Sequence, residues 1–109
     1  MRIWDIPTDK LCRQHLLGEH RELHAIWTVL TEGKVGYAKH PETVRWADSL
    51  AALYIRHEME VSEMTRRGYS HHSPLDHALA TGQKKQKTYV DSIDKQIENI
   101  HNKGCNCNV

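Results

Sequence analysis

The chain has 109 residues, with 15 Lys and Arg against 14 Asp and Glu, which gives a formal net charge of +1 at pH 7. This length predicts a single domain spanning residues 1–109, and the balanced charge excludes nucleic-acid binding through overall charge, so that only local basic clusters could provide it. The 3 cysteines cannot form a full disulfide framework, and without a long apolar run or a signal peptide we expect a soluble cytoplasmic protein with no membrane contact.

The first seven residues, MRIWDIP, alternate apolar and polar side chains. This pattern predicts an extended N-terminal arm that is anchored on the domain by Ile3 and Trp4. Thr8 or Asp9 is expected to cap the helix that follows, because either side chain can accept a hydrogen bond from a first-turn amide.

Two long helices are predicted next from apolar residues at helical spacing. The first ends at Gly33 and Gly36, and the second runs from about Glu42 to Arg67, with Gly68 as its C-terminal cap. The apolar face of the first is formed by Leu16, Leu23, Ile26, Trp27 and Leu30, and that of the second by Leu50, Leu53, Tyr54, Val61 and Met64.

A loop or short helical turn, YSHHSPLDHALATG, precedes the last predicted helix, which runs from about Lys84 to His101. Its apolar face is formed by Val90, Ile93, Ile97 and Ile100. The tail from about residue 102, NKGCNCNV, is expected to be flexible. Three amphipathic helices without a strand pattern predict an all-α fold, a compact domain of three main helices with an extended N-terminal arm.

The stretch QHLLGEHREL, residues 14–23, puts a carboxylate beside an arginine on an early part of the first helix. Taken alone, Arg21 and Glu22 are typical solvated charges. The stretch resembles, however, the segment that carries the essential glutamate in the phage pyrimidine-dimer DNA glycosylase (endonuclease V) family. The segments MRIW, KHPETV and EMTRRGY recur in the same order and at similar spacing in short members of that family, so the resemblance covers roughly residues 1–76.

The resemblance implies a site of five residues. Glu22 falls on the catalytic carboxylate of the family, and Arg21 falls on the arginine that holds lesion DNA. His15 belongs to the same helix and is implied to lie near the DNA, with a half-buried, hydrogen-bonded histidine as the alternative. Arg2 is a further expected DNA contact, and the α-amino group of Met1 is the implied nucleophile.

The assignment of Met1 depends on register. Archetypal members begin Met-Thr-Arg-Ile and expose the threonine, whereas this chain begins Met-Arg-Ile and is one residue shorter before QHL, so Met1 takes the place of that threonine. A large second residue, Arg2, favours retention of the methionine. An α-amine, with a pKa of about 7.7 to 8.0 against about 10.4 for lysine, is partly neutral and nucleophilic near pH 7.

The chain departs from the family pattern at Ala25, where archetypal members have a second arginine, and it lacks their C-terminal run of Trp and Tyr. These departures bear on the pyrimidine-dimer substrate more than on the amine chemistry.

Nine histidines raise a metal site as an alternative. His20 and His24 are four residues apart and share a helix face. The further candidate ligands are His71, His72, His77, Cys105 and Cys107. No standard ligand pattern is present, so surface histidines are the simpler interpretation, and we predict no metal and no other cofactor.

The sequence therefore predicts a DNA glycosylase with AP lyase activity, a monomer acting on double-stranded DNA that contains a lesion or an abasic site. Two alternatives remain: a catalytically inactive DNA-binding module of the same fold, and a small His/Cys metal-binding protein.

Overall fold

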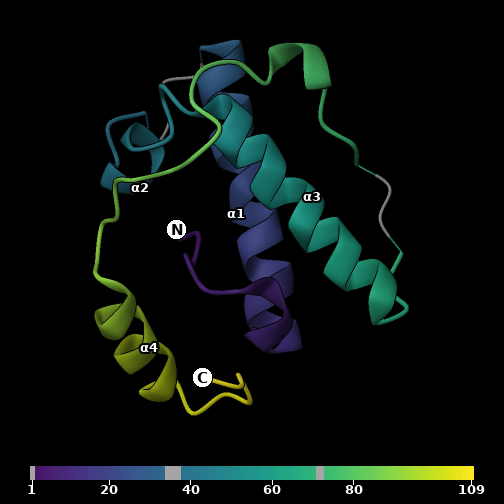
Figure 1. Ribbon diagram of the computed structural model, residues 1–109, viewed down its shortest axis with the longest axis vertical. Helices are drawn as coiled ribbons and strands as arrows, with labels where there is room; N and C mark the ends of the chain where they lie inside the picture. Colours follow the sequence, from purple (N-terminus) through teal and green to yellow (C-terminus); the bar gives the residue numbers. More distant parts are fainter. Residues whose placement is uncertain (1, 34–37, 71–72) are drawn as a thin grey trace.

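A computed structural model describes residues 2–33, 38–70 and 73–109. Figure 1 shows two long helices that cross, α1 (Arg13–Glu32) and α3 (Leu50–Arg66), with the shorter α4 (Ile93–His101) beside the N-terminal arm. Short helical turns complete the fold: η1 (Thr8–Lys10), α2 (Pro41–Val44) and η2 (His77–Leu79). No strand is found among the described residues, so the predicted all-α fold of three main helices is confirmed.

Helix α1 begins later than expected. The predicted caps, Thr8 and Asp9, lie in the 3-10 turn η1, and α1 starts at Arg13 with Cys12 as its N-cap. The turn forms because the amide of Lys10 bonds to the carbonyl of Pro7 at 3.0 Å and closes it early. Gly33 ends α1 in the left-handed conformation (φ 68°), as predicted, because a glycine adopts it without steric cost. Gly36 lies outside the described residues.

The single helix predicted from about Glu42 to Arg67 is wrong, because the chain forms α2, turns through residues 45–49 and restarts as α3. The reason lies in a distant segment. The first amides of α3 bond to residues 81–83: the amide of Ala51 donates to Thr81 (2.7 Å) and that of Ala52 donates to Gln83 (3.0 Å). Such external acceptors satisfy the free amides of a helix start.

Gly82 makes this pairing feasible. It forms an isolated bridge with Ser49 at φ 82°, and a Cβ at this position would lie 2.2 Å from the carbonyl oxygen of Asp48. A larger residue at 82 would therefore push the segment away from the start of α3.

The predicted start of the last helix at Lys84 is also wrong, because α4 begins only at Ile93. Ser92 caps it by accepting a hydrogen bond from the amide of Lys95 at 3.1 Å. The preceding residues are not helical. Gln86 donates to the carbonyl of Arg45 at 2.6 Å, and Val90 is exposed instead of lying on an apolar helix face.

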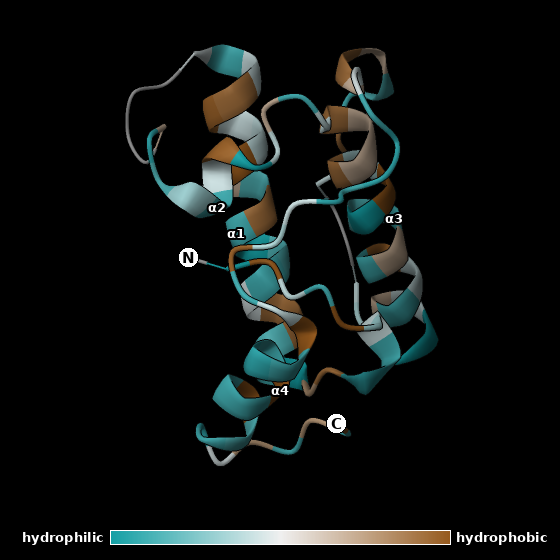
Figure 2. Ribbon diagram, turned by 60° about the vertical axis from the view of Figure 1, so that its left-hand side comes forward, coloured by the Kyte–Doolittle hydropathy of each residue, from teal (hydrophilic) through white to brown (hydrophobic). Residues whose placement is uncertain are grey.

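The apolar residues form two core clusters, and Figure 2 shows the hydrophobic stretches of α1 and α3. The first cluster joins Ile3 to Leu23 and Leu53, and the second joins Trp4 to Leu16. Cys105, Cys107 and Val109 of the tail pack against the second cluster. The apolar faces predicted for α1 and α3 are thus confirmed, and both ends of the chain take part in the core. Within the part of the chain that the structure describes, no helix has the length and apolar character needed to cross a membrane.

Candidate functional site

The N-terminal arm is fixed in register by its own backbone amides. Three successive amides each donate to a side chain of a different helix: Ile3 to Glu42 of α2 (3.0 Å), Trp4 to Glu19 of α1 (2.8 Å) and Asp5 to Gln96 of α4 (2.8 Å). These buried acceptors are necessary because an arm without strand partners would leave its amides unsatisfied. A shift of the arm by one residue would break all three bonds.

Arg45 fastens the arm from the other side. Its buried guanidinium bonds to Glu42 Oε1 (2.7 Å), to Asp5 Oδ1 (3.0 Å) and to the carbonyl of Ile3 (3.0 Å). Each nitrogen of the Arg45 guanidinium thus donates to an oxygen, and a buried ion pair is tolerated when its hydrogen bonds are satisfied in this way. The arm is therefore clamped to α2 through both its carbonyls and its side chains.

The arm runs antiparallel to α1. The Ile3 side chain packs in the same cluster as Leu23, whereas the Trp4 ring lies edge-on to His15 with ring centroids 5.5 Å apart, two turns earlier in the helix. From Trp4 back to Ile3, the arm therefore passes from the level of His15 to the level of Leu23, the neighbour of Glu22.

Glu22 and Arg21 are neighbours on α1. Glu22 is half-buried and Arg21 is exposed, and neither makes an ion pair or a side-chain hydrogen bond with any described residue. Gly18 and Ala25 are one turn before and one turn after Glu22 on the same face. A Cβ at Gly18 would have no heavy atom of another described residue within 4 Å, so the described residues leave space on this face of α1.

Arg2 lies on the outer side of the arm. Its Nη2 is 2.7 Å from Asp91 Oδ2, and its guanidinium is 4.9 Å from the centroid of the Trp4 ring. An open pocket of about 520 Å³ lies beside it, lined by Arg2, Trp4, His40, Asn99, Asn102 and Lys103. Arg2 and Lys103 are basic, and the amides of Asn99 and Asn102 are hydrogen-bond donors, so the pocket suits a phosphate group. Lys103 and His40 could not be assigned to this pocket from sequence, because they come from distant segments.

A buried network of charged side chains on α1 and α3 holds Glu19, the acceptor of the Trp4 amide. Arg56 binds both oxygens of Glu19, at 2.8 and 2.9 Å, and Glu60 lies next to this pair. Burial raises the pKa of Glu19 well above its ordinary value and raises the pKa of Glu60 to about 7, against the opposing effect of Arg56. His20 contacts Glu60 Oε1 at 2.8 Å, and burial lowers the pKa of His20. Burial thus favours the neutral form of both carboxyl groups, and the neighbouring Arg56 opposes it.

His20 and His24, predicted to share a face of α1, do so and meet His57 of α3. Their Nε2 atoms lie close together, with His24 at 3.2 Å from both His20 and His57. The Nδ1 atoms of His20 and His57 face Glu60 and Glu58. Sequence reasoning missed His57, although its place on the apolar stripe of α3, between Tyr54 and Val61, was a signal that it faces the core.

The other histidines and cysteines named as metal candidates lie in different parts of the chain, and those that the structure describes do not form one site. Residues 71–72 lie outside the described residues, and the His77 ring packs on an aromatic ring of α3. Cys105 and Cys107 lie next to His15 and Cys12 at the start of α1.

The structure describes four of the five residues expected to form the site, and these four have different neighbours. Arg21 and Glu22 are adjacent on α1, Arg2 lies across the arm, and His15 lies between the Trp4 ring and the cysteines. Met1 lies outside the described residues. Sequence reasoning missed Glu19, although its position on the apolar stripe of α1 was a signal that it is buried.

A comparison with protein-family models finds one match, described as pyrimidine dimer DNA glycosylase, over residues 1–77. The matched range contains the arm, α1, α2 and α3, and it leaves out α4 and the tail. No curated protein and no solved structure is significantly similar to the chain.

Proposed function

The chain belongs to the pyrimidine dimer DNA glycosylase family, and from this premise we propose that it excises a damaged base from double-stranded DNA and then cleaves the strand at the abasic site. Membership of this family implies a DNA-repair glycosylase whose substrate is damaged DNA. The bifunctional chemistry and the roles of individual residues are the proposal.

The proposed nucleophile is the α-amine of Met1. Its nitrogen attacks C1′ of the deoxyribose, and the bond from C1′ to the base breaks, so that the base leaves with the electron pair and takes up a proton. The nitrogen loses a proton, and the sugar ring then opens as the C1′–O4′ bond breaks and O4′ takes up a proton, which leaves an iminium at C1′. The iminium makes the C2′ proton acidic, and removal of that proton expels the 3′ phosphate by β-elimination. Water then hydrolyses the imine and regenerates the amine. No metal or organic cofactor takes part, because the amine supplies the nucleophile.

The proposed role of Glu22 is to stabilise the positive charge that develops on the sugar and to carry the protons. The observation that carries the proposal is the antiparallel course of the arm along α1. Ile3 packs in the same cluster as Leu23, the residue after Glu22, and Met1 is only two residues before Ile3. A half-buried carboxylate without an ion pair among the described residues is also a suitable group for charge stabilisation, since no cation has to be displaced first.

The DNA would approach the same face. The missing side chain at Gly18 and the small one at Ala25 leave space beside Glu22, and Arg21 and Arg2 are cations that could bind phosphates. We propose a monomer that acts on DNA inside the cell. His15, also expected to contact DNA, faces the cysteines with its Nδ1.

The test is reduction with borohydride in the presence of a duplex that contains one abasic site. The wild-type chain should become covalently linked to the abasic duplex. On a UV-irradiated duplex, Glu22→Gln should lose base excision while binding the DNA within a few fold of the wild-type affinity. Glu32→Gln is the matched control, because Glu32 is an exposed glutamate at the far end of the same helix.

A wild-type chain that binds abasic duplex but gives no adduct would support the alternative, a DNA-binding module without activity. Full excision by Glu22→Gln would leave the family assignment intact and remove Glu22 from the mechanism.

A further inference from the structure

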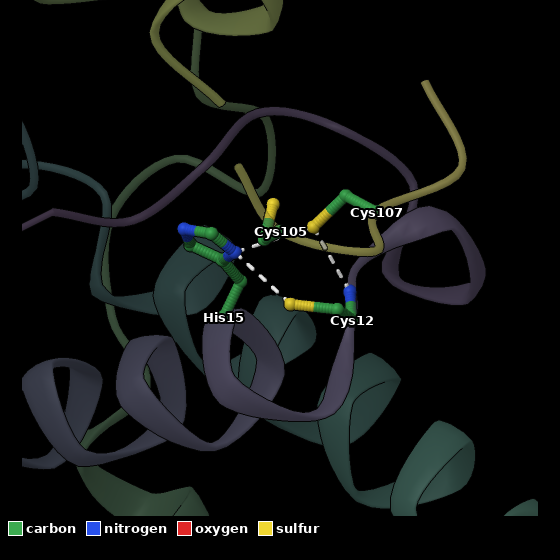
Figure 3. Close-up of side chains that lie close together, drawn as sticks. All are labelled: Cys12, His15, Cys105 and Cys107. Atoms are coloured by element: carbon green, nitrogen blue, oxygen red, sulfur yellow. Dashed lines mark hydrogen bonds between the residues drawn. The ribbon is translucent and has the colours of Figure 1, made fainter. Parts of the chain in front are cut away.

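All three cysteines of the chain meet one histidine. Cys12 is the N-cap of α1 and His15 lies in its first turn, while Cys105 and Cys107 come from the tail after α4. Figure 3 shows the four side chains converging from these two segments. Cys12 and His15 share a face because they are three residues apart in a helix. Residues separated by about ninety positions thus form one compact cluster.

The ligand atoms have the spacing of a metal site. The His15 Nδ1 atom is 3.1 Å from Cys12 Sγ and 3.2 Å from Cys107 Sγ, and all four ligand atoms lie within 4.8 Å of one another. A tetrahedral zinc ion, with Zn–S of about 2.3 Å and Zn–N of about 2.0 Å, separates its ligand atoms by about 3.5 to 3.8 Å. Side-chain shifts of up to about 1 Å would bring the cluster to this geometry.

We propose that Cys12, His15, Cys105 and Cys107 bind one zinc ion. Three thiolates and an imidazole are a soft donor set of the kind that selects zinc, and four protein ligands fill its tetrahedral coordination. The site is therefore structural, since no position remains open for water or substrate. This inference does not depend on the glycosylase activity.

The surroundings fit a metal–thiolate centre. The amide of Cys12 donates to Cys107 Sγ at 3.0 Å, as backbone amides do to zinc-bound sulfur, and the amide of Asn108 donates to the carbonyl of Lys10 at 2.8 Å, which holds the tail beside η1. The Cys105 thiol now donates to the carbonyl of Ile100 at 3.6 Å, and zinc binding would release that proton. A disulfide could join only two of the three sulfurs, and the cysteines are free.

The zinc would fasten the C-terminal tail to the start of α1. Both cysteines of the tail lie beyond the matched residues 1–77, so the centre joins the part shared with the family to the segment outside it. Because zinc binds the folded arrangement and not the unfolded chain, it stabilises the fold by its binding free energy. His15 becomes a zinc ligand that supports the Trp4 ring of the arm, instead of a group that contacts DNA.

The test is elemental analysis of the full-length chain, purified without an affinity tag that binds metals, together with cobalt substitution. We expect about one zinc per chain, and cobalt(II) in its place should give the intense visible bands of tetrahedral coordination and a thiolate charge-transfer band in the near ultraviolet. Cys107→Ser and Cys12→Ser should each lower the zinc content to near zero. Asn106→Ser, between the two tail cysteines, is the matched control and should keep the metal.

Cobalt spectra of the wild-type chain test the ligand set even if a cysteine variant fails to fold. Three results would overturn the proposal. The first is a wild-type chain that contains no zinc and does not bind zinc chloride after reduction. The second is a disulfide in the freshly purified chain. The third is zinc that persists in both cysteine variants and is lost in His24→Asn, which would move the metal to the histidines between α1 and α3.

Discussion

The backbone amide of Trp4 donates a hydrogen bond of 2.8 Å to Oε1 of Glu19, which lies in the first half of α1. Arg56 of α3 binds both oxygens of the same carboxylate. One buried side chain thus connects the arm, α1 and α3. The position of the arm therefore depends on a carboxyl group that has no contact with solvent.

Replacing Glu19 with alanine should lower the free energy of unfolding by about 3 to 5 kcal/mol, because it leaves the guanidinium of Arg56 buried without its partner. Denaturant unfolding followed by circular dichroism measures this change. Glu22→Gln, which removes a charge of the same helix without an ion pair among the described residues, should change stability by no more than about 0.5 kcal/mol. A loss below about 1 kcal/mol in Glu19→Ala would show that the network does not hold the fold.

Arg21 and Arg2 should differ in their effect on DNA binding. Arg21→Ala should weaken binding to abasic duplex by about 1 to 3 kcal/mol and reduce the salt dependence by about one charge. Arg2→Ala should cost less, because Arg2 must first give up its ion pair with Asp91. Asp91→Asn should therefore strengthen binding, as measured by fluorescence anisotropy at several salt concentrations. If all three variants bind abasic duplex with the affinity of the wild-type chain, this face does not contact the DNA.

The apolar faces of α1 and α3 could be predicted from spacing alone, and so could their ends at Gly33 and Gly68, because these features depend on residues close in sequence. The break between α2 and α3 could not be predicted. It depends on Gly82 pairing with Ser49, a contact between segments that no local pattern connects.

The candidate site divides in the same way. Arg21 and Glu22 are neighbours in sequence and were found through a motif, whereas the union of Cys12 and His15 with the tail depends on how α4 returns the chain to the start of α1. The motif with two cysteines one residue apart was visible, but its partners were about ninety residues away. Long-range pairing of this kind is set by the packing of the core and not by spacing.

Glu63 gives the fold a defined pH dependence. Its carboxylate binds Arg66 and also Arg67 (2.5 Å), and Arg67 in turn bonds to the carbonyl of Leu11 at 2.6 Å. Hydrogen bonds from Arg66, together with those from Arg67, lower the pKa of Glu63 below its ordinary value of 4.5. The unfolded chain therefore takes up this proton before the folded chain does as the pH falls.

The stabilisation from Glu63 should be complete above about pH 5 and should be lost as the pH falls from 4.5 toward the lowered pKa of the folded state. Glu63→Gln should thus be less stable than the wild-type chain by about 1 to 3 kcal/mol at pH 7, and the two should converge in acid. Urea unfolding from pH 7 to pH 3 measures the difference. Glu32→Gln serves as the control because Glu32 is exposed and has no ion pair with a described residue. A difference that stays constant down to pH 3 would contradict the assignment.

The last prediction concerns the α-amine of Met1. Acetylation, or a short extension before Met1, should abolish imine trapping and strand cleavage while the domain stays folded, because an amide nitrogen has no available lone pair and added residues would fill the space of the sugar. A fusion partner whose proteolytic removal leaves Met1 as the first residue is the matched control, and its removal should restore trapping. Mass spectrometry of the reduced adduct should place the sugar remnant on the peptide that begins at Met1. An adduct on a lysine peptide, or undiminished trapping by a chain with an intact extension, would assign the chemistry to another amine, and the family membership and the fold would remain as they are.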